Sequence, residues 1–184
     1  MNLYENQAIR QFIKKYVGKD KLPYKFLETP YFFRRADTKQ LKSLHNKYSG
    51  QRCFIIGNGP SLNKCDLTKL ANEQSFAVNG IFYKTRDMGY KPTFYVVEDS
   101  HVMKDNLESI NEYDVEHKFF PIDYKGYVSN KKNVSFFKMN TGFYQETSPN
   151  FCIPRFSTDC ADQIYCGQSV TMINLQLAYY MGFT

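Results

Sequence analysis

The sequence predicts an α/β protein with a Rossmann-like, mostly parallel sheet flanked by helices. From residue 51 onward, short apolar runs alternate with helical segments, which is typical of parallel strands joined by helices. Glycine and polar residues follow three of these runs where each strand should end. We therefore expect a helical N-terminal extension over residues 1–50 and a nucleotide-binding domain over residues 51–184.

The composition is that of a soluble globular protein. The chain has 184 residues, of which 42% are hydrophobic and 23% charged, and its formal net charge is +6. That charge suits an anionic ligand, a membrane surface or a nucleic acid, and it equally suits a solvated basic face. Lysine and arginine are spread along the chain without a recognition module, so no nucleic-acid partner is expected.

The extension should contain two helices. The first has helically spaced apolar residues and ends at Gly18; the second runs from about Thr38 to Tyr48. The spaced residues of the first helix are Ile9, Phe12, Ile13, Tyr16 and Val17. This basic segment could pack against the domain, a partner subunit or the inner face of a membrane.

The domain should contain five strands, at residues 52–56, 76–78, 93–97, 119–121 and 134–139. Helical segments are expected at 67–70, 81–89, 100–113 and in the last helix, which ends at Gly182. Residues 140–166 should form a long irregular flap. A helix in this position normally leads into another strand, so we expect the C-terminal part of the fold to be missing.

Cysteine spacing and the N-terminus predict a cytoplasmic location. The five cysteines include no CxxC pair, which disfavours a structural zinc site and suggests reduced thiols. The N-terminus has no apolar signal core, and no apolar run reaches the roughly 20 residues of a membrane span. We also expect a homo-oligomer.

Three strand ends should form one polar rim, because ligands of open α/β sheets bind beyond the carboxyl ends of the strands. The first strand is followed by Gly57-Asn58-Gly59-Pro60-Ser61, the second by Asn79-Gly80 and the third by Glu98-Asp99-Ser100.

The first loop suits a phosphate. Gly57 and Gly59 allow a positive φ and close approach of a ligand to the backbone, and Ser61 could cap a following helix. The loop has no P-loop lysine and no GxGxxG spacing, which disfavours a Walker-type ATPase. A tight strand-to-helix turn without a ligand is the alternative.

The other two strand ends offer amide and carboxylate groups. Asn79 could bind a base, a ribose hydroxyl or a neighbouring loop. Glu98 and Asp99 could hold Mg²⁺, or Asp99 could instead cap the helix at 100–113. Beyond Mg²⁺, no tightly bound cofactor is expected.

A family resemblance rests on three strings that occur in order: "IIGNGPSL", "KPTFYVVEDS" and "SVTMINLQLAYYMGF". Together they resemble the family that groups bacterial motility accessory factors with archaeal 6-hydroxymethylpterin diphosphokinases. More distantly they resemble small bacterial sialyltransferases that use CMP-sialic acid. The resemblance covers about residues 51–184.

The resemblance implies roles for individual residues. The nucleotide contacts of the sialyltransferases match Gly57, Asn58, Gly59, Ser61 and Asn79. Their donor-sugar contacts match Gln168, Ser169 and Thr171. Glu98-Asp99 departs from the sialyltransferases and is more similar to the acidic position of the diphosphokinases. The sialyltransferase tyrosine pair and histidine base have no counterpart before Thr184, so no catalytic base is assigned.

Three functions remain open. The leading one is a sialyltransferase-like glycosyltransferase that uses a CMP-sugar donor and a glycan acceptor in surface polysaccharide biosynthesis. The second is a Mg²⁺-dependent, ATP-using diphosphokinase of the hydroxymethylpterin type, favoured by Glu98 and Asp99. The third is a non-catalytic nucleotide-binding or interaction module.

Overall fold

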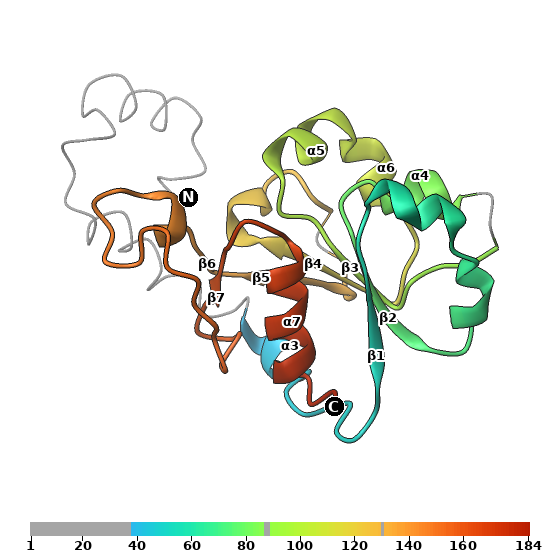
Figure 1. Ribbon diagram of the computed structural model, residues 1–184, viewed down its shortest axis with the longest axis horizontal. Helices are drawn as coiled ribbons and strands as arrows, with labels where there is room; N and C mark the ends of the chain where they lie inside the picture. Colours follow the sequence, from blue (N-terminus) through green and yellow to red (C-terminus); the bar gives the residue numbers. More distant parts are fainter. Residues whose placement is uncertain (1–37, 87–88, 130) are drawn as a thin grey trace. The chain divides into compact units, whose positions relative to one another are not determined.

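A five-stranded sheet with the order β1-β2-β3-β4-β5 forms the centre of the fold (Figure 1). All neighbouring strands are parallel, as the sequence predicts. The strands are β1 (Cys53–Ile56), β2 (Gln74–Val78), β3 (Phe94–Val96), β4 (His117–Pro121) and β5 (Val134–Phe137). The computed structural model describes residues 38–86, 89–129 and 131–184, so the helix expected around residues 9–17 lies outside the described residues.

The connecting helices lie together on one face of the sheet. They are α4 (Ile81–Thr85), α5 (Ser100–Asp105) and α6 (Leu107–Glu112). The strand order across the sheet follows the chain without reversing. Because crossovers between parallel strands are right-handed, all the connections then lie on the same face of the sheet. Between β1 and β2 the connection consists of two 3₁₀ helices, Pro60–Lys64 and Leu67–Leu70; a third, Ile122–Tyr124, follows β4.

The opposite face is covered by α3 (Thr38–Lys42) and α7 (Thr171–Tyr180), which come from opposite ends of the described chain (Figure 1). Side chains alternate between the two faces of a strand, so Phe76, Phe94 and Phe119 reach this core. The buried cluster contains Leu41, Leu44, Tyr48, Phe76, Phe94, Val96, Phe119, Phe137, Ile164, Ile173, Leu177, Tyr180 and Met181.

Residues 38–50 are part of the same compact unit as the sheet, which spans Asp37–Thr184. The sequence pattern alone places these residues in the N-terminal extension. Leu41 is fully buried, and the N–H of Tyr48 donates to the carbonyl of Met181 at 2.9 Å. The helix expected over 38–48 ends at Lys42 and continues as turns.

Two further predicted segments differ in detail. The helix expected at 100–113 is divided into α5 and α6 at Asn106, whose φ is −130°. Residues 140–166 are largely irregular, as expected, but the short parallel pair β6 (Met139–Asn140) and β7 (Ile164–Tyr165) fastens the two ends of this segment. We call residues 141–167 the flap.

Two further features concern membrane-spanning helices and cysteine pairing. Within the described ranges, no helix combines the length and apolar character that crossing a bilayer requires. All five cysteines lie in the described part of the chain, and each has a free thiol.

Candidate functional site

The polar segments after β1, β2 and β3 lie at the carboxyl ends of the strands, and hydrogen bonds join each of the first two to the neighbouring strand. Asn58 Nδ2 donates to the carbonyl of Val78 at 2.7 Å, which joins the first loop to the end of β2. The N–H of Asn79 donates to the carbonyl of Val96 at 2.9 Å, which joins the end of β2 to β3. The structure therefore brings together the three strand ends that the sequence analysis grouped as a rim.

The loop after β1 is exposed. Gly57 and Gly59 allow a positive φ, but neither adopts one in the folded chain. A Cβ atom added to Gly57 would meet no atom within 4 Å. The N–H groups of Gly57, Asn58 and Gly59 donate to no other residue within the described part of the chain. The loop thus presents main-chain donors and open space to a ligand.

Ser61 does not cap the helical segment that follows the loop, as the sequence suggests it could. The segment Pro60–Lys64 is a 3₁₀ helix that Gly59 precedes, with no side-chain cap, and Ser61 lies inside it. So short a helix adds little dipole, and any attraction for an anion must come from the loop N–H groups themselves.

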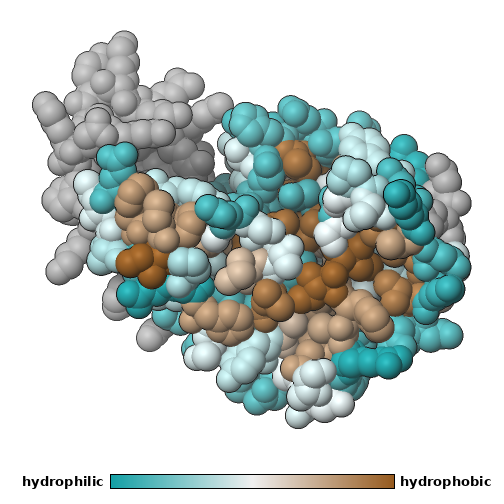
Figure 2. Space-filling model, in the orientation of Figure 1, coloured by the Kyte–Doolittle hydropathy of each residue, from teal (hydrophilic) through white to brown (hydrophobic). Residues whose placement is uncertain are grey.

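A groove of about 480 Å³ runs beside this loop along β1, the edge strand. It is lined by both polar and apolar residues: Phe54, Ile55, Ile56, Gly57, Gly59, Ser61, Leu62, Cys65, Asp66, Leu67, Lys69 and Leu70. Figure 2 shows apolar residues gathered in a band over α7 and β1. The loop therefore borders a surface that offers both main-chain donors and apolar contact.

Asn79 is held in an uncommon conformation that directs its side chain. Its φ is 46°, in the left-handed region, which asparagine tolerates better than most residues. The hydroxyl of Tyr95 donates to its carbonyl at 2.5 Å. Its Oδ1 atom is buried and has no hydrogen-bond partner among the described residues. A buried acceptor without a partner is costly, and a ligand donor would relieve that cost.

Asp99 and Glu98 differ in what their carboxylates contact. Asp99 caps α5: its Oδ1 accepts from the N–H groups of His101, at 2.7 Å, and Val102, at 3.1 Å. This is the capping alternative named in the sequence analysis. Burial, and then the charge of Asp99, raise the pKa of the Glu98 carboxyl.

Glu98 is surrounded by residues that the sequence analysis did not select. The hydroxyl of Tyr124, just after β4, donates to the carbonyl of Glu98 at 2.6 Å. Burial and the nearby charge of Glu98 raise the pKa of the Cys166 thiol to about 11. The pKa of the Tyr144 hydroxyl is also raised, mainly by burial and secondly by the charge of Glu98. Cys166 directly follows β7 and Tyr124 closely follows β4. Their positions just beyond strand ends are the sequence signal by which both residues could be recognised as rim candidates.

The carboxylates of Glu98 and Asp99 are oxygen donors of the kind that Mg²⁺ prefers, although Oδ1 of Asp99 already caps α5. The described residues contain no group of three histidine, cysteine or acidic side chains that could hold a metal alone. Neither Glu98 nor Asp99 forms an ion pair with a described residue. Mg²⁺ is commonly bound through one or two carboxylates plus substrate phosphates, so the donor set suits that mode of binding.

The predicted substrate contacts Gln168, Ser169 and Thr171 lie at the start of α7. The N–H of Thr184 donates to the carbonyl of Gln51 at 3.0 Å, which places the end of α7 beside the start of β1. The helix therefore runs antiparallel to β1, and its first residues lie toward the rim. The side chain of Ser169 accepts from the N–H of Thr171 at 3.2 Å, and Gln168 is exposed.

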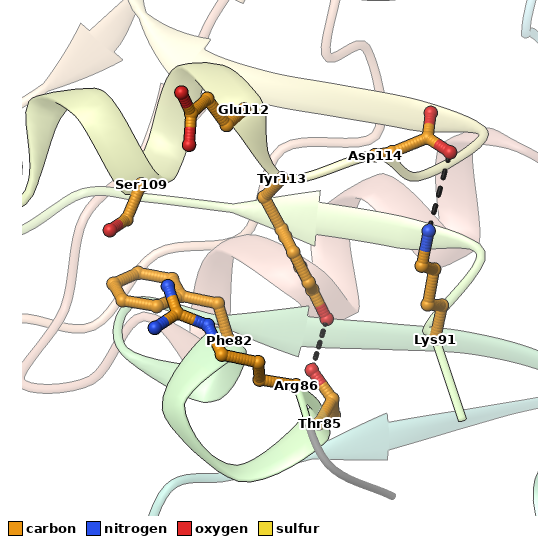
Figure 3. Close-up of a pocket in the computed structure, with 8 residues that line it drawn as sticks. All are labelled: Phe82, Thr85, Arg86, Lys91, Ser109, Glu112, Tyr113 and Asp114. Carbon is orange, nitrogen blue, oxygen red and sulfur yellow. Dashed lines mark hydrogen bonds and ion pairs between the residues drawn. The ribbon is translucent and has the colours of Figure 1, made fainter. Parts of the chain in front are cut away.

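A second cavity, of about 270 Å³, lies between α4 and α6 (Figure 3). Lys91 and Asp114 form an ion pair at 3.3 Å beside it, and Thr85 and Tyr113 share a hydrogen bond at 2.7 Å. Lys91 and Asp114 precede β3 and β4, so this cavity is at the amino ends of the strands. These four polar groups are paired with one another, whereas the rim has a buried acceptor without a partner among the described residues, so the rim is the better candidate for a ligand site.

Comparison with known proteins gives one match. Residues 28–184 match the model of the family described as "6-hydroxymethylpterin diphosphokinase MptE-like", so the match includes the whole rim, the flap and α7. The chain matches no curated protein and no solved structure. The family found is the one that the three sequence strings resemble, whereas the likeness to sialyltransferases receives no support.

Proposed function

Because the chain belongs to the 6-hydroxymethylpterin diphosphokinase MptE-like family, we propose that it transfers a diphosphoryl group from ATP to the hydroxymethyl group of a pterin. Family membership supports this function better than the CMP-sugar glycosyltransferase that the sequence analysis placed first. In the proposed reaction the acceptor oxygen bonds to the β-phosphorus. The bond from that phosphorus to the α,β-bridging oxygen breaks, AMP leaves, and the hydroxyl proton is released.

The observation that carries the proposal is the presence of a donor loop and an acidic pair on one rim. Loop N–H groups after β1 would bind phosphate oxygens of ATP. Glu98 and Asp99, after β3, would hold Mg²⁺. When bound, Mg²⁺ would neutralise the charge that develops on the phosphate oxygens.

The remaining rim residues would bind the substrates. The side chain of Asn58 is fixed by the bond from its Nδ2 to the carbonyl of Val78, and Asn58 and Ser61 would contact the nucleotide from the loop after β1. Asn79 would accept a hydrogen bond from the base or ribose through Oδ1. Gln168, Ser169 and Thr171 would contact the acceptor side.

The proposal can be tested with two isosteric variants, Glu98→Gln and Asp99→Asn. Each removes one negative charge, and asparagine is as good an N-cap as aspartate, so α5 should remain capped. We expect the affinity for Mg²⁺–ATP, measured by calorimetry, to fall on the order of tenfold or more in each variant. AMP release in the presence of 6-hydroxymethylpterin should fall with it.

A matched control is Asp114→Asn, which removes the same charge at the opposite end of the sheet. Asp114 pairs with Lys91 and is well exposed, so nucleotide binding should not change. Wild-type affinity for Mg²⁺–ATP in both rim variants would contradict the proposed metal site. Tight binding of CMP without binding of ATP would instead favour the glycosyltransferase.

A further inference from the structure

Tyr144 presents an exposed aromatic ring on the flap. The residue is 54% exposed, although it lies between the buried Gly142 and Phe143 and the ordered turns that follow. Its hydroxyl donates to the carbonyl of Gly167 at 2.6 Å, so the polar end of the side chain is fixed while a large part of the residue faces solvent.

The buried ring of Phe143 supports the ring of Tyr144. Phe143, which is 8% exposed, contacts it edge-on, with ring centroids 5.1 Å apart and an interplanar angle of 84°. The N–H of Tyr144 donates to the carbonyl of Thr141 at 3.0 Å, and the N–H of Cys152 donates to that of Phe143 at 3.0 Å. A ring anchored at both ends loses little conformational freedom when a ligand packs on it.

The bond to Gly167 places Tyr144 at the rim. Gly167 lies between Cys166, which directly follows β7, and Gln168, at the approach to α7. Because the first residues of α7 lie toward the rim, the bond to Gly167 places Tyr144 on that side of the sheet. The charge of Glu98 also contributes to the raised pKa of both Tyr144 and Cys166. The flap follows β5 and β6, and β5 is the edge strand opposite to β1. Glu98, which follows the central strand β3, therefore lies between the β1 loop and Tyr144.

This order along the rim matches what the proposed reaction requires. The attacking and leaving oxygens lie roughly in line on opposite sides of the phosphorus. If the β1 loop binds the nucleotide, the acceptor has to approach from the flap side of Glu98. A hydroxymethyl group there would have its ring over the flap.

We infer that Tyr144 is the stacking platform for the flat heteroaromatic ring of the acceptor. The inference rests on the proposed function and deepens it, because it assigns the ring of the acceptor to one residue and to one wall of the rim. An exposed tyrosine ring offers a flat face on which such a ring can stack, and stacking of this kind contributes to the binding affinity.

The test measures binding of 6-hydroxymethylpterin by its fluorescence, without ATP, to the full chain. Tyr144→Leu should weaken binding about tenfold and abolish quenching by the stacked ring. Tyr144→Phe keeps the ring and should retain most of the affinity. In turnover assays Tyr144→Leu should raise KM for the pterin more than it lowers kcat, while its affinity for Mg²⁺–ATP stays that of the wild type.

Tyr179→Leu is the matched control. Tyr179 is 56% exposed and has the same edge-on contact with a phenylalanine, Phe156, at 5.6 Å and 84°, but it is near the end of α7 distant from the rim. Its substitution should leave pterin binding unchanged.

The outcomes separate this inference from the proposed function. Equal pterin affinity in wild type and Tyr144→Leu would overturn the inference while leaving the diphosphokinase intact. Binding of Mg²⁺–ATP by a wild-type protein that binds no flat heteroaromatic alcohol would also overturn it. Tyr144-dependent binding of the pterin without any diphosphoryl transfer would support the stacking platform and remove the proposed reaction.

Discussion

At the scale of single residues, the glycines after β1 and the asparagine after β2 differ in what their backbones require. Gly57 has no positive φ, and nothing lies where a Cβ atom would be added. Asn79, in contrast, adopts a φ of 46° with a buried Oδ1 that has no partner among the described residues. The fold therefore does not need glycine at position 57, and a ligand that approaches the backbone closely is the better reason for it.

Gly57→Ala should separate folding from binding. Replacing a glycine whose backbone an alanine can adopt stabilises a protein by about 0.4–1 kcal/mol, because the unfolded chain loses freedom. We expect the thermal midpoint to be unchanged or slightly higher. The affinity for Mg²⁺–ATP should fall about tenfold, because the new methyl group occupies space beside the loop N–H groups. Unchanged affinity would show that no ligand packs against Gly57.

At the scale of the elements, the end of α7 shows how a cap fastens a helix to distant parts of the chain. The N–H of Phe183 donates to the carbonyl of Ala178 at 3.1 Å, and that of Gly182 to Tyr179 at 3.0 Å. This pair of bonds is a Schellman cap, and Gly182 has the required φ of +87°. Phe183 then stacks on Tyr48, with ring centroids 4.9 Å apart. The cap therefore joins α7 to the segment that follows α3.

Gly182→Ala should destabilise the protein, and a second glycine provides the comparison. A Cβ atom at Gly182 would lie 3.1 Å from the Cα of Asn46, and the left-handed φ adds about 1–2 kcal/mol. Gly50 has a φ of +74° but nothing within 4 Å of an added Cβ, so Gly50→Ala has only the backbone cost. In urea unfolding, Gly182→Ala should lose clearly more free energy of unfolding than Gly50→Ala. Equal losses would mean that the contact with Asn46 relaxes easily.

At the scale of the whole molecule, the core between the sheet and α3 contains a histidine that should remain neutral. Nε2 of His117 lies 2.8 Å from the hydroxyl of Ser135, and its ring centroid is 4.7 Å from that of Phe119. Burial, and then the positive charge of Lys47, lower the pKa of His117 to about 4. Protonation is thus easier in the unfolded chain, where the pKa is near 6.5.

This shift predicts a loss of stability in mild acid. Above pH 6.5 both states hold His117 neutral, so its contribution is constant; it is lost as the pH falls from 6.5 toward 4. The free energy of unfolding should decrease by up to about 3 kcal/mol over that window. His117→Gln should be less stable at pH 7 but should vary less with pH. Parallel pH profiles of wild type and variant in urea unfolding would contradict this.

Much of the sheet could be predicted because its signals are local. Runs such as Cys53–Ile56 are apolar and bounded by glycine and polar residues, and the parallel arrangement follows from the helices between them. Asn79 and Glu98 could be selected because they end strands. Tyr144 could not be selected, because its place at the rim depends on a hydrogen bond to Gly167, which is 23 residues away.

The α/β class, the order of the strands along the chain and the three polar strand ends follow from local sequence, since each depends on residues that are close neighbours. The partners that these groups meet depend on tertiary packing. Packing places Leu41 and Ile173 on the same face of the sheet, uses Asp99 to cap α5, and brings the flap to Glu98. These contacts join residues far apart in the chain, and the buried area and hydrogen bonds that fix them exist only once the sheet has formed.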